Sequence, residues 1–107
     1  MNDAERRAAR WYRLRGWRIL GTNVWAAGNE VDLIVRRGRT LRFVEVKEKC
    51  GPAYGDPLEA VSEEKQRRVR RAAEAWLATH PECDALQPGF DVVAVWAGRL
   101  ERLPEAF

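Results

Sequence analysis

The chain has 107 residues, of which 46% are hydrophobic and 33% are charged, as is typical of one globular domain, so we expect a single domain over residues 1–107. No apolar run approaches the ~20 residues that a transmembrane helix needs, which argues against a membrane protein. The net charge of +3 comes from sixteen arginines and three lysines set against sixteen acids. This balance permits nucleic-acid binding without establishing it.

Two further features predict a cytoplasmic protein. The first residues, Met1 to Arg7, lack the apolar core of a signal peptide. Cys50 and Cys83 form neither a metal-binding spacing nor a disulfide framework, and isolated thiols suit a reducing compartment.

The N-terminal segment predicts a helix followed by a strand. Asp3 can cap a helix that runs to about Arg15 and ends at Gly16. Glu5 falls on or beside the inward face of this helix, whereas the arginines point to water. Residues 17–25 are rich in β-forming residues and predict the first strand.

Two apolar runs, 30–36 and 40–47, predict a central hairpin that turns at Arg37-Gly38. A loop symmetric about these two residues places Asp32 opposite Phe43 and Glu30 opposite Glu45. One face then gathers Glu30, Asp32, Glu45 and Lys47 at the end away from the turn. The other face is apolar and carries Val31, Leu33, Val35, Val44 and Val46. Because Ile34, Leu41 and Phe43 continue the first face, helices should cover the sheet on both sides.

The remainder of the chain predicts one helix and two strands. The helix can begin after a capping box at residues 56–59 or after Ser62, and it runs to about Thr79. Residues 90–96 predict a buried strand, and residues 99–103 predict a short last strand. The fold class is therefore α/β, with the order α-β-β-β-α-β-β and a mixed sheet flanked by helices.

Ionised side chains inside the central hairpin must be compensated, because burying them unpaired costs several kcal/mol. A Mg²⁺ ion held by Asp32 and Glu45 would relieve their repulsion, with the Val46 carbonyl as a further ligand. Lys47 can then hold the attacking water or the scissile phosphate. This is equipment for metal-assisted hydrolysis of a phosphodiester bond.

Two interpretations without a metal compete with this one. The spacing of Asp32, Glu45 and Lys47 alone is also found in solvated hairpins with alternating charges. The apolar flanks of both strands argue against that interpretation, but they leave open a buried salt-bridge cluster that needs no metal.

A resemblance makes the hypothesis more specific. Glu5 on a helix, Asp32 on one strand, Glu45-Val46-Lys47 on the next strand and a following helix resemble the PD-(D/E)XK nuclease superfamily, with its restriction-endonuclease-like core. The chain resembles more closely the small bacterial YraN-like family of uncharacterised proteins. The matching stretches are Glu5-x-x-Ala8-Ala9, residues 16–20, Asn23, residues 30–34, 43–47 and 57–61, Lys65, Ala73-x-x-Trp76-Leu77 and residues 90–95.

The core of that family is also similar to archaeal Holliday-junction resolvases. This resemblance implies a Mg²⁺- or Mn²⁺-dependent nuclease that acts on DNA in preference to RNA, on branched or damaged structures, as a possible homodimer. Asp32, Glu45 and Val46 would hold the metal, Lys47 would act at the phosphate, and Glu5 would complete the site. Lys65 and Gln66, at the start of the second helix, would contact nucleic acid.

The alternative function is a non-catalytic module on the same fold that binds nucleic acid or another protein. The set of two acids and a lysine argues against a pure nucleic-acid binder, because clustered carboxylates repel phosphates.

Overall fold

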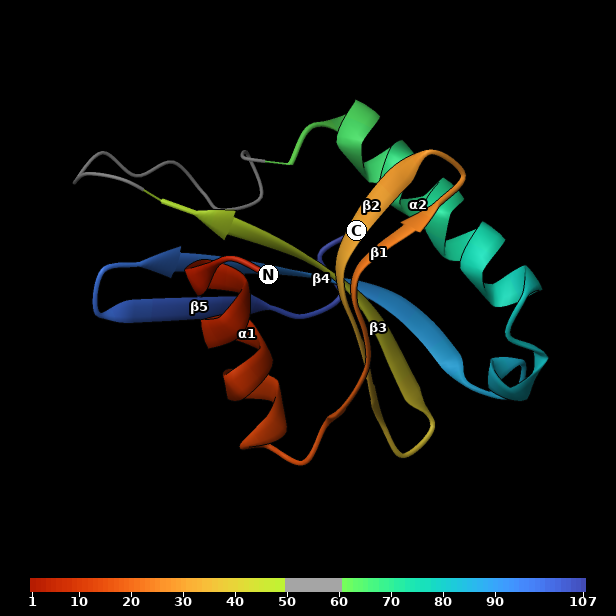
Figure 1. Ribbon diagram of the computed structural model, residues 1–107, viewed down its shortest axis with the longest axis horizontal. Coiled ribbons are helices and arrows are strands. Elements are labelled where there is room, and N and C mark those ends of the chain that lie inside the picture. The colour runs from red at the N-terminus through yellow and green to blue at the C-terminus, as the bar shows by residue number, and fades with distance from the viewer. Residues whose placement is uncertain (50–60) are drawn as a thin grey trace.

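The computed structural model describes residues 1–49 and 61–107, which form two helices packed on a five-stranded sheet (Figure 1). In chain order the elements are α1 (Asp3–Arg13), β1 (Arg18–Ala26), β2 (Asn29–Arg37), β3 (Thr40–Glu48), α2 (Glu63–Ala78), the 3₁₀ helix η2 (Pro81–Cys83), β4 (Gln87–Trp96) and β5 (Arg99–Leu103). The predicted order α-β-β-β-α-β-β is confirmed, and only η2 was not expected.

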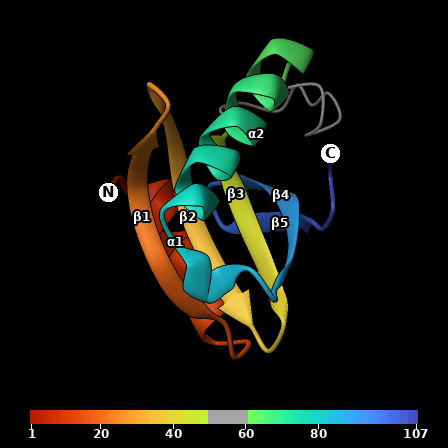
Figure 2. The same ribbon diagram turned by 90° about the vertical axis from the view of Figure 1, so that its right-hand side faces the viewer.

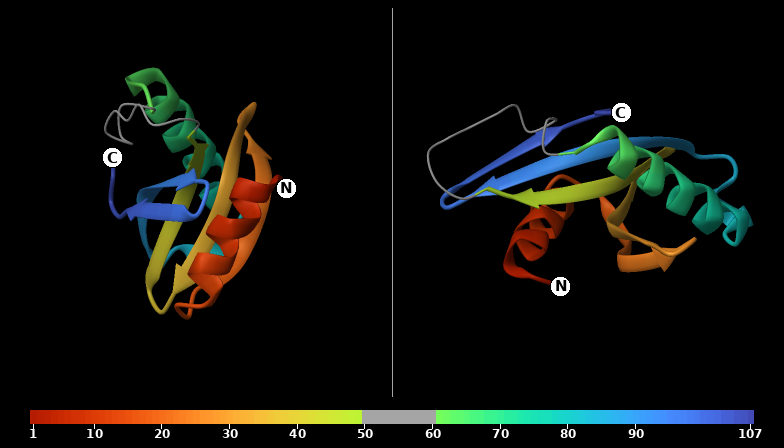
Figure 3. Two further views of the ribbon diagram at one scale, coloured as in Figure 1. Left: turned by 90° about the vertical axis from the view of Figure 1, so that its left-hand side faces the viewer. Right: turned by 90° about the horizontal axis from the view of Figure 1, so that it is seen from above.

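The sheet is mixed, as predicted, with the strands in chain order from β1 to β5. Neighbouring strands are antiparallel except β3 and β4, which are parallel. Parallel neighbours need a long crossover, and α2 lies in that crossover. Views from opposite sides show α2 in front of the sheet in Figure 2 and α1 in front of it in the left panel of Figure 3. The helices therefore cover opposite faces.

Each helix packs on one face of the sheet and forms an apolar core with it. The α1 core contains Ala8, Tyr12, Trp17, Leu33, Val35, Val44 and Val93. The α2 core contains Val31, Ile34, Leu41, Phe43, Ala72, Ala73 and Trp76. The prediction that Val31 shares a face with Leu33 is wrong, because Val31 packs in the α2 core. The pairing of β1 with β2 is also irregular, because its register shifts at a bulge between Ile19 and Gly21 of β1.

The central turn lies one residue later than predicted. Arg37 pairs with Thr40, so the loop consists of Gly38 and Arg39. Gly38 has a φ of 61°, which the first position of a two-residue hairpin loop requires and which glycine adopts without strain.

This shift corrects the predicted cross-strand partners. Phe43 lies opposite Ile34 and not opposite Asp32. The paired stretch ends at Leu33 and Val44, so Glu30 and Glu45 lie beyond it and are not partners either. Moving the register by two residues leaves each side chain on its original face, whereas a shift of one would have reversed every face.

The helix starts also refine the prediction. Asn2, not Asp3, caps α1: its side chain accepts a hydrogen bond from the Glu5 amide, and the Glu5 carboxylate accepts one from the Asn2 amide. Ser62 caps α2 by accepting from the Lys65 amide. The alternative cap at residues 56–59 lies outside the described residues.

Strand β4 begins three residues before the predicted start, at Gln87 instead of Phe90. Pro88 and Gly89 suggest a loop in the sequence, but both lie in the strand, opposite Leu41 and Arg42 of β3. Proline is tolerated there because β5 pairs only with residues 92–96, so the other side of Pro88 is a free edge. Neither α1 nor α2 is long and apolar enough to cross a membrane, and the same is true of every helix in the described residues.

Candidate metal centre

The predicted acids gather where β2 separates from β3. Figure 1 shows the β1–β2 ribbon and the C-terminal half of β3 diverging from a common crossing point. Beyond the Leu33–Val44 pair, the Val46 amide donates a hydrogen bond of 2.8 Å to Oδ2 of Asp32. The hydrogen bond from the Val46 amide thus lies beyond the last backbone pair of β2 and β3. It holds the Asp32 carboxylate in the fork between the two strands.

Three carboxylates from α1 and β2 meet at this fork. Glu5, Glu30 and Asp32 each offer one carboxylate oxygen, and these oxygens all lie within 4.8 Å of one another. Glu5 is 7% exposed, so its charge is largely withdrawn from water. We call these three residues the acid trio. Such close carboxylates repel each other strongly unless protons or cations lie between them.

Asn23 of β1 bridges two members of the acid trio. Its side-chain amide nitrogen donates a hydrogen bond of 2.9 Å to Glu5 Oε2 and one of 2.7 Å to Glu30 Oε1. The backbone of Asn23 has a φ of 48°, a left-handed conformation that asparagine tolerates better than most residues. Asn23 therefore supplies a neutral donor that links Glu5 of α1 to Glu30 of β2.

Glu45 of β3 forms the second half of the site and lies towards α2. Its side chain is 5% exposed, and Oε1 faces Lys47 Nζ at 3.9 Å and Lys65 Nζ at 3.7 Å. The other oxygen, Oε2, is buried without a hydrogen-bond partner among the described residues. A buried carboxylate oxygen without a donor is costly, so this atom has an open coordination position.

The two central acids perturb each other. Burial and the negative charge of Glu45 raise the pKa of Asp32 to about 8, although the Val46 amide opposes the rise. Burial also raises the pKa of Glu45, while Lys65 and Lys47 lower it. In both residues desolvation is the largest cause, because a charge surrounded by protein loses the hydration that stabilises it. The metal-free site therefore retains a proton near neutral pH.

Comparison with known proteins identifies the family of the chain. The family model described as uncharacterised protein family UPF0102 matches residues 4–95. The chain belongs to this family. The UPF0102 proteins YraN of Escherichia coli K12 and of Shigella sonnei are each 38% identical to it over 104 residues, which cover 96% of this chain and 79% of each relative. The resemblance to YraN-like proteins is confirmed.

All of the predicted site residues lie within the part that the UPF0102 model matches. The structure brings Glu5, Asp32, Glu45, Lys47 and Lys65 to the fork, as described above. The Val46 amide contacts Asp32, and ligation through the Val46 carbonyl stays a prediction. The Gln66 side chain donates a hydrogen bond of 3.2 Å to the Val61 carbonyl, which is a local contact at the start of α2.

Two contributions to this UPF0102 site were not assigned from the sequence. Glu30 was noted as an acid on the correct face but was given no role, and the structure makes it a member of the acid trio. Asn23 was noted only as part of the matching stretches. The available signal was a polar residue inside a β-forming run, at a position where the structure has a left-handed backbone.

Proposed function

We propose that the protein is a Mg²⁺- or Mn²⁺-dependent nuclease that hydrolyses DNA phosphodiester bonds, with a preference for branched or damaged DNA. One observation carries the proposal. The half-buried carboxylate of Asp32 and the buried carboxylate of Glu45 lie together in the fork, and Oε2 of Glu45, which has no partner among the described residues, is an open acceptor. Structural ion clusters normally match such acids with donors, whereas metal sites leave them free to ligate.

The donor set fits a hard divalent cation. Mg²⁺ and Mn²⁺ prefer oxygen ligands, and all of the candidate groups are carboxylates or backbone carbonyls. Asp32 and Glu45 would hold the ion, with the Val46 carbonyl as a further ligand and with Glu5 and Glu30 close to Asp32. When bound, such an ion polarises a phosphoryl oxygen and lowers the pKa of a coordinated water.

The lysines of the site complement a phosphate. Lys47 and Lys65 have side chains that are 34% and 33% exposed, and both ammonium groups face Oε1 of Glu45. They are therefore held at the carboxylate and remain open to solvent. Lys65 also lies in the first turn of α2, where the helix dipole favours an anion. We assign Lys47 to the scissile phosphate or the attacking water, and Lys65 to the neighbouring phosphate.

Cleavage assays test this function directly. Labelled single-stranded, duplex, flap and four-way-junction DNA, and a matched RNA strand, are incubated with the protein in Mg²⁺ or Mn²⁺. We expect cleavage of DNA, its abolition in Asp32→Asn, and a loss of about 10²–10³-fold in Lys47→Ala, as for the removal of one transition-state donor. Glu101→Gln, which changes an acid that pairs with Arg99 on β5, is the matched control.

Two results would contradict the proposal. If no substrate is cut, or if the Asp32→Asn variant cuts as well as the wild type, the site is not catalytic. Binding of DNA without cleavage would then favour the non-catalytic module, and binding of neither DNA nor Mn²⁺ would favour a protein-interaction module with a metal-free charge cluster. Because resolution of a junction needs two active sites, sedimentation with and without junction DNA tests the predicted homodimer.

A further inference from the structure

Trp25, near the end of β1, is an aromatic side chain that the packing of the protein does not explain. It is 69% exposed, and it makes no ring or guanidinium contact within the described residues. The other four tryptophans each contact a ring or a guanidinium group of the protein. An exposed indole presents a large apolar face to water, which favours its use in binding.

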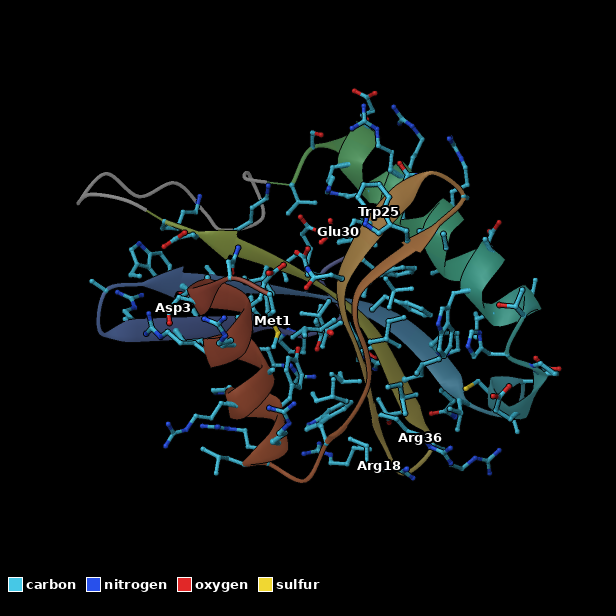
Figure 4. All side chains as sticks on the ribbon, in the orientation of Figure 1. Met1, Asp3, Arg18, Trp25, Glu30 and Arg36 are labelled. Carbon is cyan, nitrogen blue, oxygen red and sulfur yellow. The ribbon has the colours of Figure 1, made fainter. Side chains whose placement is uncertain are left out.

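The indole lies beside the acid trio. Trp25 is the cross-strand partner of Glu30, and directly opposed residues have Cβ atoms about 4.5–5.5 Å apart on one face. Val24 and Ala26 pack towards the α2 core, so alternation along the strand turns Trp25 to the face of Glu30. Figure 4 shows Trp25 and Glu30 together at one end of the β1–β2 ribbon, whereas Arg18 and Arg36 lie at the other end.

The surroundings leave room for a flat ring. Trp25 borders an open groove of about 510 Å³ between the end of the β1–β2 hairpin and the C-terminal half of α2. The α2 side of the groove includes Trp76, with the His80 ring stacked on it at a centroid distance of 3.9 Å. The indole is therefore open to solvent at its border with the groove, and a flat ring can approach it.

We infer that Trp25 is a stacking platform for an unpaired nucleobase next to the phosphate that the acid cluster engages. The inference rests on the proposed function and names its substrate class: nucleic acid with unpaired nucleotides at the cleavage site. Base faces inside a duplex are covered by their neighbours, so a surface indole stacks only on a base that has left the helix. Single strands, flaps and junctions supply such bases.

The neighbours of Trp25 favour a base over a protein partner. Protein interfaces surround an aromatic anchor with a contiguous apolar patch. On the face of the acid trio the neighbours of Trp25 are polar or charged, namely Asn23 and Glu30, and apolar residues border it only on the groove side. An exposed indole beside a site for phosphate chemistry is an arrangement by which single-stranded nucleic acid is bound.

Binding measurements in Ca²⁺ test the platform. The anisotropy of a labelled oligodeoxynucleotide is measured with the wild type, Trp25→Ala, Trp25→Phe and the control Leu14→Ala, which removes an equally exposed apolar side chain from the far end of α1. We expect Trp25→Ala to weaken single-strand binding about 5- to 150-fold, the loss typical of one base stack. Trp25→Phe should keep most of the affinity, and the affinity for blunt duplex should change little.

A series of strands, each with one abasic position, locates the stacked base. One position should weaken binding to the wild type and have no effect on binding to Trp25→Ala. The inference is overturned if Trp25→Ala binds single strands as the wild type does, if it loses duplex and single-strand affinity equally, or if it changes only the sedimentation of the protein. The last result would indicate a protein interface.

The inference and the proposed function can fail separately. Binding that depends on Trp25, in a protein that cuts no substrate in Mg²⁺ or Mn²⁺, keeps the platform and removes the nuclease. Cleavage of flaps that is equal in the wild type and Trp25→Ala keeps the nuclease and removes the platform.

Discussion

Two aspartates of the same sheet, the buried Asp91 and the half-buried Asp32, have opposite surroundings. Asp91 on β4 is fully buried, and its carboxylate receives the Tyr12 hydroxyl at 2.7 Å and Arg102 Nε at 2.9 Å. The Glu105 amide donates to its other oxygen at 3.1 Å, and Arg42 Nε lies 3.6 Å from that oxygen. Donors and cations thus satisfy both oxygens of Asp91.

Among the residues that the structure describes, Asp32 receives one amide donor, from Val46, and its charged neighbours are carboxylates. Both aspartates lie in apolar runs, so the sequence around them is similar, but only Asp91 is matched by the protein itself. The Asp91 network joins α1, β3, β5 and the C-terminal segment, which indicates a structural role. A charge removed from water therefore marks a functional site when the fold leaves it uncompensated.

The largest expected effect is on the compensated aspartate. Asp91→Asn removes the counter-charge of Arg42 and Arg102 without changing the side-chain volume. Because it removes the ion-pair partner of the half-buried Arg102 and leaves the buried Arg42 with Glu105 alone, we expect the free energy of unfolding to fall by about 3 kcal/mol. Urea denaturation measures this change, with Glu101→Gln as the control. A cost as small as that of the control would show that the network does not stabilise the fold.

The second effect is stabilisation by a metal at the uncompensated aspartate. At a Mn²⁺ concentration a hundred times its dissociation constant, the wild type should gain about 2.7 kcal/mol of unfolding free energy. Asp32→Asn should lose this gain. In metal-free buffer the variant should be more stable than the wild type, because its neutral amide neither repels Glu45 nor has to take up a proton on folding. Thermal melts with Mn²⁺ and with a chelator report both quantities. An equal Mn²⁺ response in the variant and the wild type contradicts the assignment of Asp32.

The third effect is a dependence on pH. Since the pKa of Asp32 rises from 3.8 to about 8 on folding, the folded protein binds more protons than the unfolded chain between these values. The contribution of Asp32 to stability is thus fully present below pH 3.8 and is lost as the pH rises towards 8. Metal binding must displace this proton, so Mn²⁺ affinity should increase up to about tenfold per pH unit until about pH 8. Calorimetric titration from pH 6 to pH 9 checks the slope, and Asp32→Asn should flatten it.

The smallest effect concerns Asn23. Asn23→Ala removes the donor shared by Glu5 and Glu30, and the expected cost in metal-free buffer is about 0.5–1.5 kcal/mol. Asn23→Asp should cost more, because it adds a fourth acid to the trio, and Mn²⁺ should narrow the difference between the two variants. If Mn²⁺ leaves that difference unchanged, Asn23 acts on the backbone alone and not through the carboxylates.

Sequence patterns predicted the elements and, except at Val31, most of their faces, because both depend on local periodicity. The inward position of Glu5 followed from helical spacing, and Asp32 and Glu45 are neighbours in spite of the error in the turn. The error itself arose because Gly38 can occupy more than one position of a short turn. The cap of α1 was misplaced by one residue because Asn2 and Asp3 are both good caps.

Contacts between residues that are distant in the chain could not be predicted from the sequence. An isolated acid in the run 90–96 gives no sign that Asp91 meets residues as distant as Tyr12 and Glu105. Likewise, the divergence of β2 from β3 depends on the twist of the whole sheet, and it decides that Asp32 neighbours Glu5 as well as Glu45. Charges in apolar runs could be located from the sequence, but whether the fold compensates them could not.

The most direct test of the central claim is an anomalous difference map from crystals grown in Mn²⁺. We predict a strong peak in the fork, coordinated by Asp32 and by Glu45, whose Oε2 would become a ligand. No peak should lie at Asp91, where the protein supplies the compensation. A fork without a peak at saturating Mn²⁺, with Asp32 and Glu45 still in contact, would show that a shared proton alone compensates the two acids, and it would contradict the account.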